Sequence, residues 1–80
     1  MLFRSYLKNP KGDFAGRLIE TVGLKGKKIG DMEFSNTHAN FLVNHENGTF
    51  DEAITLINLA KQKVKEQFNI ELETEIIIFE

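Results

Sequence analysis

Residues 49–69 read TFDEAITLINLAKQKVKEQFN, and this stretch predicts the helix on which the fold is built. Thr49 and Glu52 have the spacing of a capping box, in which each side chain bonds the backbone amide of the other residue. Apolar residues then recur every three or four positions and form one stripe: Phe50, Ala53, Ile57, Ala60, Val64 and Phe68. Burying such a stripe stabilises a fold by about 1.5–3 kcal/mol for each large side chain. We therefore expect an amphipathic helix that ends at Asn69.

The segments around this helix predict four strands and one shorter helix. Alternating or β-branched residues mark strands at residues 2–7, 29–34, 39–44 and 72–79. The middle two should pair antiparallel across a loop at residues 35–38, where Met32 and Phe34 share one face and Ala39, Phe41 and Val43 share another.

The shorter helix should follow Asp13 as its cap and stop at Gly23, with this apolar stripe: Phe14, Leu18, Ile19 and Val22. The element order predicts an α+β two-layer sandwich, in which a small and mostly antiparallel sheet carries both helices on one face.

Composition limits the classes of function. The 80 residues form a single domain, 1–80, with 10 basic and 12 acidic side chains and a net charge of −2. This balance gives no general attraction to nucleic acid or to an anionic membrane. The chain has no cysteine, which excludes disulfides and thiol chemistry within it. Residues 1–80 contain no apolar run of membrane-spanning length, and their first residues lack the long apolar core of a secretory signal, so we expect neither a membrane span nor a leader. We expect a cytoplasmic protein with no metal site.

Three groups of polar residues could carry chemistry, although each also has an ordinary structural explanation. Glu73 and Glu75 share a strand face and could act as an acid–base pair, but most such pairs are solvated. The lysines at positions 25, 27 and 28 could hold a phosphate, or could simply form an exposed turn. His38 lies in a polar loop that could bind a sugar or phosphate, or could be a turn histidine. Periodicity and spacing alone do not decide among these alternatives.

Three stretches, in order along the chain, resemble motifs of one enzyme family. Residues 4–10 read RSYLKNP, similar to that family's G-S-x-F-K-N-P. Residues 15–44 contain AGRLIE, GLKGKKIG and SNTHANFLVN, similar to A-G-x-L-I-E, G-L-K-G-x-x-I-G and S-x-x-H-A-N-F-I-V-N. Residues 64–76 read VKEQFNIELETEI, similar to V-x-x-x-F-G-I-x-L-x-x-E-V. Together these stretches resemble the C-terminal, substrate-binding domain of UDP-N-acetylenolpyruvoylglucosamine reductases.

The resemblance implies an FAD-dependent, NADPH-consuming oxidoreductase of peptidoglycan precursor synthesis. Such an enzyme converts UDP-N-acetylglucosamine enolpyruvate to UDP-N-acetylmuramate, and so serves cell-wall biogenesis, cell shape and cell division. The family's flavin-binding domains precede this region, so we expect the 80 residues by themselves to bind neither FAD nor NADPH and to be inactive. The implied partners are the substrate and those N-terminal domains, in a bacterial cytoplasm.

The resemblance also assigns roles to five residues. Ser5 stands at the position of the family's proton donor, and Glu75 at that of the glutamate that supports protonation. Asn9, Lys25 and His38 stand at substrate-binding positions. By the same alignment, Glu73 becomes a solvated carboxylate. Because Ser5 and Glu75 lie near opposite ends of the chain, the fold must bring the first and last strands together.

Three residues depart from the family pattern and put local geometry in question. Arg4 and Asp31 replace glycines, and Leu7 replaces a phenylalanine. An alternative to the enzyme fragment is a free-standing, non-catalytic binding module, for which Leu59, off the main stripe, could belong to a docking surface.

Overall fold

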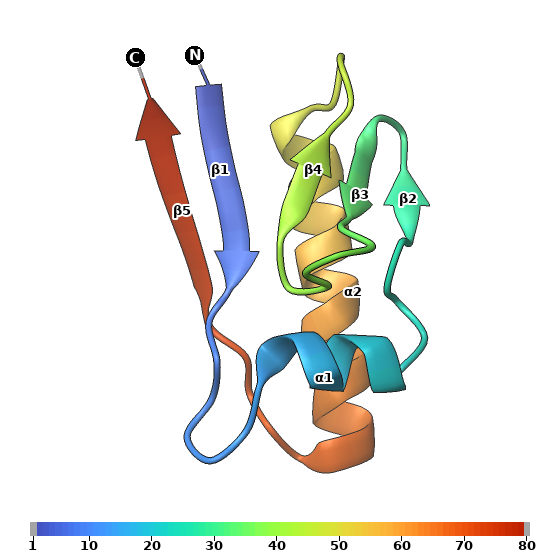
Figure 1. Cartoon of the computed structure of the whole chain (residues 1–80), viewed down its shortest axis with the longest axis vertical. Coiled ribbons are helices and arrows are strands. Elements are labelled where there is room, and N and C mark those ends of the chain that lie inside the picture. Colours follow the sequence, from blue (N-terminus) through green and yellow to red (C-terminus); the bar gives the residue numbers. More distant parts are fainter. Residues whose placement is uncertain (1, 80) are drawn as a thin grey trace.

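The protein folds as two small antiparallel sheets with two helices packed around them (Figure 1). The computed structural model describes the backbone of residues 2–79 and the side chains of residues 6–75. The elements are, in chain order: β1 (Leu2–Leu7), α1 (Ala15–Thr21), β2 (Lys28–Ile29), β3 (Met32–Phe34), β4 (Leu42–Asn44), α2 (Phe50–Phe68) and β5 (Thr74–Phe79). The α+β class and the antiparallel pairing expected from the sequence are confirmed.

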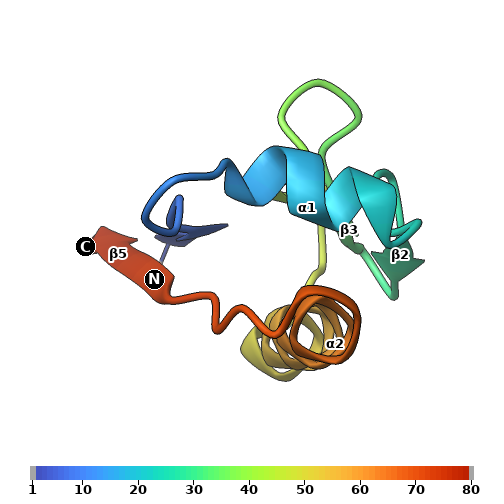
Figure 2. The ribbon, with the colours of Figure 1, turned by 90° about the horizontal axis from the view of Figure 1, so that it is seen from below.

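The strands are divided between two sheets, whereas the sequence suggested one. β1 and β5 form a two-stranded ribbon, and β2, β3 and β4 form the second sheet in that order. An isolated bridge between Tyr6 and Phe41 links the two. Figure 2, seen from below, shows the ribbon set to one side of the helices. The expected proximity of the first and last strands is therefore present.

Helix α2 lies behind the three-stranded sheet and follows the sequence pattern closely (Figure 1). The Thr49 and Glu52 capping box is formed, with Glu52 donating its amide to Thr49 Oγ1 at 3.1 Å and Thr49 donating to Glu52 Oε1 at 2.9 Å. Asn69 ends the helix in the left-handed conformation, at φ 56°. The expected start, end and cap of this helix are confirmed.

The buried face of α2 differs from the expected stripe at two positions. Phe50, the first helical residue, is 48% exposed, whereas Leu56 is fully buried although it was not assigned to the stripe. Leu56 lies three and four positions from Ala53 and Ala60, so the apolar face is broader than one stripe. Leu59 is partly buried against the core, which removes the observation that favoured a docking surface there.

Helix α1 crosses below the end of the three-stranded sheet and contacts α2 (Figure 1). Its cap position is Phe14, not Asp13, and Phe14 is 67% exposed instead of packed. At the other end the prediction of Gly23 as the stop is confirmed, at φ 83°. Gly23 and Leu24 donate their amides to Glu20 and Ile19, which is the hydrogen-bond pattern of a Schellman motif.

The strand expected at residues 29–34 is two strands. The chain reverses at Gly30, at φ 58°, and β2 folds back on β3 so that Ile29 pairs with Met32. The strand expected at residues 39–44 is shorter, because Ala39 and Asn40 belong to a turn. Leu42 points into the core in β4, while Phe41 and Val43 are more than one-third exposed.

Asp31 and Leu7, two of the departures from the family pattern, fit their positions. Gly30 takes the left-handed conformation of the turn, so Asp31 needs no glycine geometry, and its carboxylate accepts the Asn47 amide at 3.0 Å. Leu7 is fully buried and fills the core where the family has phenylalanine. The Arg4 side chain lies outside the described residues.

Substitution of Gly30 should destabilise the domain more than substitution of Gly12. Both have positive φ, which costs a non-glycine residue about 1–2 kcal/mol. A Cβ at Gly12 meets nothing within 4 Å, whereas a Cβ at Gly30 would overlap the Glu52 carboxylate. The Glu52 carboxylate can move aside only by leaving the capping box, a further loss of about 1 kcal/mol.

We therefore expect Gly30→Ala to lower the free energy of unfolding in urea by about 1 kcal/mol more than Gly12→Ala. Equal losses for the two variants would contradict the coupling between the β2–β3 turn and the helix cap.

Candidate functional site

The ribbon of β1 and β5 places the two predicted catalytic residues on neighbouring strands. Ser5 pairs with Ile76, and Tyr6 pairs with Glu75. Glu75 is thus opposite the residue that follows Ser5. The Ser5 side chain lies outside the described residues, so its role stays a prediction.

Lys8 is the ion-pair partner of the Glu75 carboxylate. The Lys8 Nζ and Glu75 Oε2 atoms are 3.7 Å apart, and both side chains are nearly half exposed. The Lys8 amide donates to the Glu73 carbonyl at 2.8 Å, which extends the ladder beyond the strand ends. Glu73 is exposed, in line with its reading as a solvated carboxylate.

Asn9 caps helix α1 in addition to its predicted contact with substrate. Its Oδ1 accepts the backbone amide of Ala15 at 2.9 Å. That bond uses one lone pair of the side-chain oxygen and leaves the Nδ2 group, which can only donate, for another molecule. This bond spans six residues and depends on how the chain turns between β1 and α1, so no local sequence pattern predicted it.

Lys25 and His38 belong to two loops that pack against each other. Gly26 lies so close to Asn36 that a Cβ built on it would be 2.5 Å from Asn36 Oδ1. Lys25 Nζ lies 3.5 Å from Glu20 Oε1 at the end of α1. The loops that carry Lys25 and His38 therefore lie against each other at Gly26 and Asn36, while the Lys25 side chain itself is paired with Glu20.

The loop of His38 is ordered by its own polar residues. Ser35 Oγ accepts the amides of Thr37 and His38, at 3.0 and 3.1 Å. His38 itself is exposed, and its imidazole lies next to the Phe41 ring with the centroids 5.8 Å apart. The Tyr6 ring lies 5.3 Å from the same phenylalanine. This row of three rings spans the two sheets and was not foreseen from the sequence.

The segment between β1 and α1 is held by Asp13 and Arg17. The Arg17 Nε atom donates to Asp13 Oδ1 at 2.8 Å, and Nη2 donates to Oδ2. These bonds, with a further one from the Phe14 amide, lower the pKa of Asp13 from 3.8 to about 2. The Arg17 guanidinium also lies 5.7 Å from the centre of the Phe68 ring, a cation–π contact that joins α1 to α2.

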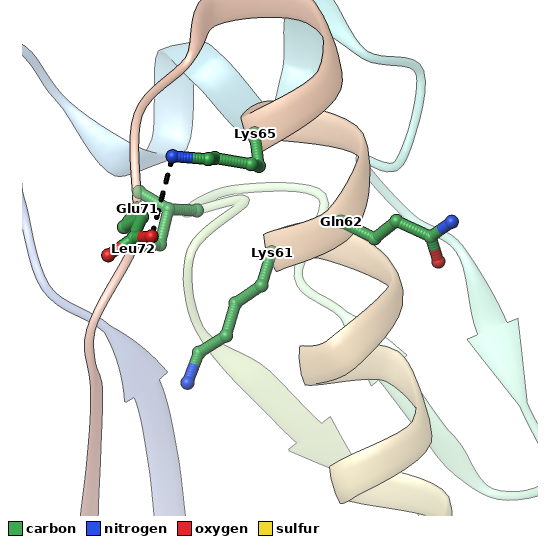
Figure 3. A pocket seen from close by; sticks show the side chains of 5 residues that line it. All are labelled: Lys61, Gln62, Lys65, Glu71 and Leu72. Carbon is green, nitrogen blue, oxygen red and sulfur yellow. Dashed lines mark ion pairs between the residues drawn. The ribbon is translucent and has the colours of Figure 1, made fainter.

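Two open hollows differ in their relation to the predicted residues. One of about 410 Å³ lies between α2 and the segment before β5 and is lined by Lys61, Gln62, Lys65, Glu71 and Leu72. Figure 3 shows Lys65 turned toward Glu71, with which it forms an ion pair at 3.4 Å. None of the five predicted site residues lines it. A second hollow, of about 220 Å³, has Asn9 and Lys8 in its wall.

Within the described part of the chain, no group of three or more His, Asp or Glu side chains is arranged to hold a metal ion. Over the same residues, neither helix has the length and apolarity needed to cross a membrane.

Comparison with known proteins identifies what the chain resembles. The family model for the C-terminal domain of UDP-N-acetylenolpyruvoylglucosamine reductase matches residues 4–79. The reductase of Campylobacter jejuni strain RM1221 is 59% identical over 76 residues, which cover 95% of this chain and 30% of that protein. The reductase of Aquifex aeolicus is 53% identical over 76 residues, which cover 95% of this chain and 26% of that protein.

A solved structure agrees with these relatives. The crystal structure of UDP-N-acetylenolpyruvylglucosamine reductase from Thermus caldophilus superposes with a TM-score of 0.68 and 40% identity. The match covers 88% of this chain and 25% of that one. The chain thus spans less than a third of the length of these curated relatives.

The cap formed by Asn9 predicts different effects for two substitutions. Asn9→Ala removes the acceptor for the Ala15 amide and should lower the free energy of unfolding by about 1 kcal/mol. Asn9→Asp keeps an acceptor, and its negative charge is favourable at a helix N-terminus, so stability should be retained. Urea unfolding at pH 7 measures both, and equal stability of the two variants would contradict the cap.

The Asp13–Arg17 pair predicts a pH dependence. Because folding lowers the Asp13 pKa, its contribution to stability is present above pH 3.8 and is lost as pH falls toward 2. Arg17→Met should raise the Asp13 pKa toward 3.8 and reduce the loss of stability in that interval. Carboxyl-carbon NMR titration and acid unfolding measure the two effects. Lys11→Met, which removes a charge from the same segment, is the control and should leave the Asp13 pKa low.

Proposed function

Because this chain belongs to the UDP-N-acetylenolpyruvoylglucosamine reductase family, as its C-terminal domain, we propose that it provides the substrate-binding and proton-donating part of such a reductase. The reaction converts UDP-N-acetylglucosamine enolpyruvate to UDP-N-acetylmuramate and belongs to peptidoglycan precursor synthesis. The match over residues 4–79 carries this proposal.

The proposed chemistry is the addition of a hydride and a proton across the enolpyruvyl double bond. FAD, reduced by NADPH, supplies the hydride when it is bound. Hydride addition leaves negative charge on the carbon next to the substrate carboxylate, and that carbon must then be protonated. We assign the proton to the Ser5 hydroxyl and assign Glu75 to the support of that transfer.

A serine hydroxyl is a weak acid, so it needs neighbours that organise the transfer. The pairing of β1 with β5 brings the two strands together, but its register sets Glu75 opposite Tyr6 and Ser5 opposite Ile76. Because successive residues of a strand alternate faces, Ser5 and Glu75 belong to opposite faces of the ribbon, and the family motif alone supports their joint assignment. Lys8, 3.7 Å from the Glu75 carboxylate, gives that carboxylate a fixed cationic neighbour.

Three residues are proposed to bind the substrate. The Nδ2 group of Asn9 donates a hydrogen bond to an acceptor such as a phosphate or carboxylate oxygen, while its Oδ1 accepts the Ala15 amide. The Lys25 ammonium pairs with a negative group of the diphosphate or carboxylate, and the His38 imidazole makes a polar contact. The close packing of the Lys25 and His38 loops supports their action on one ligand.

We propose that the flavin and NADPH are bound by a part of the reductase outside these 80 residues. Both hollows are open to solvent, whereas a bound cofactor is usually enclosed over most of its surface. The assembled enzyme is expected to act in the bacterial cytoplasm.

A chimeric enzyme tests the assigned role of Ser5. In this chimera, residues 4–79 replace the matching segment of the Campylobacter jejuni reductase, which is 59% identical. Ser5→Ala should leave flavin reduction by NADPH unchanged and slow flavin reoxidation by substrate by about 10²–10⁴-fold, as expected for a lost general acid.

Stopped-flow absorbance of the flavin measures both half-reactions. Thr55→Ala, on the exposed side of α2, is the control and should change neither. Equal slowing of both half-reactions by Ser5→Ala would refute the role, and a parent chimera that is reduced by NADPH but not reoxidised would refute the proposed function.

A further inference from the structure

The proposed site is divided between the two sheets of the domain. Ser5 and Glu75 belong to the β1–β5 ribbon, whereas His38 belongs to the loop between β3 and β4. One substrate can reach all three only if the loop keeps a fixed position relative to the ribbon. The contacts that join the two sheets are therefore of functional interest.

Two kinds of contact join the sheets at this place. Leu7 donates its amide to the Asn40 carbonyl at 2.9 Å, and Asn40 Nδ2 donates to the Leu7 carbonyl at 3.0 Å. Beside these bonds, Tyr6 and Phe41 form an isolated antiparallel bridge and pack their rings 5.3 Å apart. The hydrogen bonds hold Leu7 of β1 against Asn40 of the turn before β4, and the packed rings hold the Tyr6 and Phe41 side chains beside them.

The Phe41 ring is the element that reaches His38. It lies 5.3 Å from the Tyr6 ring on one side and 5.8 Å from the His38 imidazole on the other. The Ser35 hydroxyl accepts the His38 backbone amide, and the His38 side chain forms no hydrogen bond or ion pair with another described residue. The orientation of the imidazole thus depends on its packing against Phe41.

Phe41 is less buried than a core phenylalanine. Its side chain is 37% exposed, while the phenylalanine of the core, Phe34, is fully buried. A phenylalanine that stays partly in water contributes less burial energy than its size allows. An aromatic ring at position 41 can pack against both Tyr6 and His38, which lie on either side of it.

We propose that Phe41, supported by Tyr6, is a positioning residue that holds the His38 imidazole on the face of the β1–β5 ribbon to which Glu75 belongs. Tyr6 pairs with Glu75 in the ladder and precedes the Leu7–Asn40 bonds, so the row of rings begins at the predicted catalytic strands. This inference rests on the proposed function. Tyr6 and Phe41 are the residues whose rings connect the β1–β5 ribbon to the loop of His38.

Kinetics of the chimera defined above test the inference with two variants of Phe41. Phe41→Leu keeps an apolar side chain but removes the ring, and Phe41→Tyr keeps the ring. Phe41→Leu should lower kcat/KM for UDP-N-acetylglucosamine enolpyruvate by about 10–100-fold through misplacement of His38. Flavin reduction by NADPH should not change, and Phe41→Tyr should retain most of the parent activity.

The 80-residue chain gives a second measurement that does not require turnover. In its NMR spectrum we expect nuclear Overhauser contacts from the Phe41 ring to the rings of Tyr6 and His38. Phe41→Leu should shift the His38 imidazole signals toward their values in an unstructured peptide, while the amide signals of α2 stay in place. Such a result supports the positioning of His38 by Phe41 even if the chimera is inactive and the proposed function is wrong.

Two outcomes would overturn the inference while leaving the proposed function intact. One is an active chimera in which Phe41→Leu keeps the parent kcat/KM. The other is a chain in which the His38 signals are indifferent to the loss of the ring.

Discussion

Leu7 and Asn40 exchange two hydrogen bonds, and the rest of the domain depends on this junction. The bonds, at 2.9 and 3.0 Å, join the β1–β5 ribbon to the turn before β4. The Leu7 side chain, fully buried, continues the same junction into the core. A two-stranded ribbon is marginally stable by itself in water, so β1 and β5 depend on this attachment to the larger sheet.

The other fixed point of the domain is the start of α2. The Glu52 carboxylate closes the capping box and at the same time lies against Gly30 in the β2–β3 turn. Gly48 is similarly close to the Met32 side chain, which is buried in the core. The positions of α2 and of the three-stranded sheet therefore depend on each other. A side chain at Gly30 would displace Glu52, and a side chain at Gly48 would displace Met32.

Much of the fold, but less of the site, could be predicted from the sequence. The capping box, the end of α2 at Asn69, the stop at Gly23 and the bounds of β1 all follow from local patterns and are present. The β2–β3 reversal was missed, because Gly30 was read inside a strand. Family motifs assigned Asn9 to substrate binding, but its bond to Ala15 depends on where α1 lies after the chain turns at Pro10.

The sequence by itself determined the helices, the class of fold and the family. Capping residues, apolar periodicity and family motifs each involve residues that are close together in the sequence, so they can be recognised before the chain is folded. Only the tertiary structure decided the division into two sheets, the pairing of Tyr6 with Glu75 and the row of Tyr6, Phe41 and His38. The contacts of Tyr6 with Phe41 and with Glu75 join residues that are 35 and 69 positions apart in the chain. Alternation along a strand predicts which of its residues share a face, but it does not predict which distant strand will pair with it. Strand pairing is decided when the core between the sheets and α2 is packed.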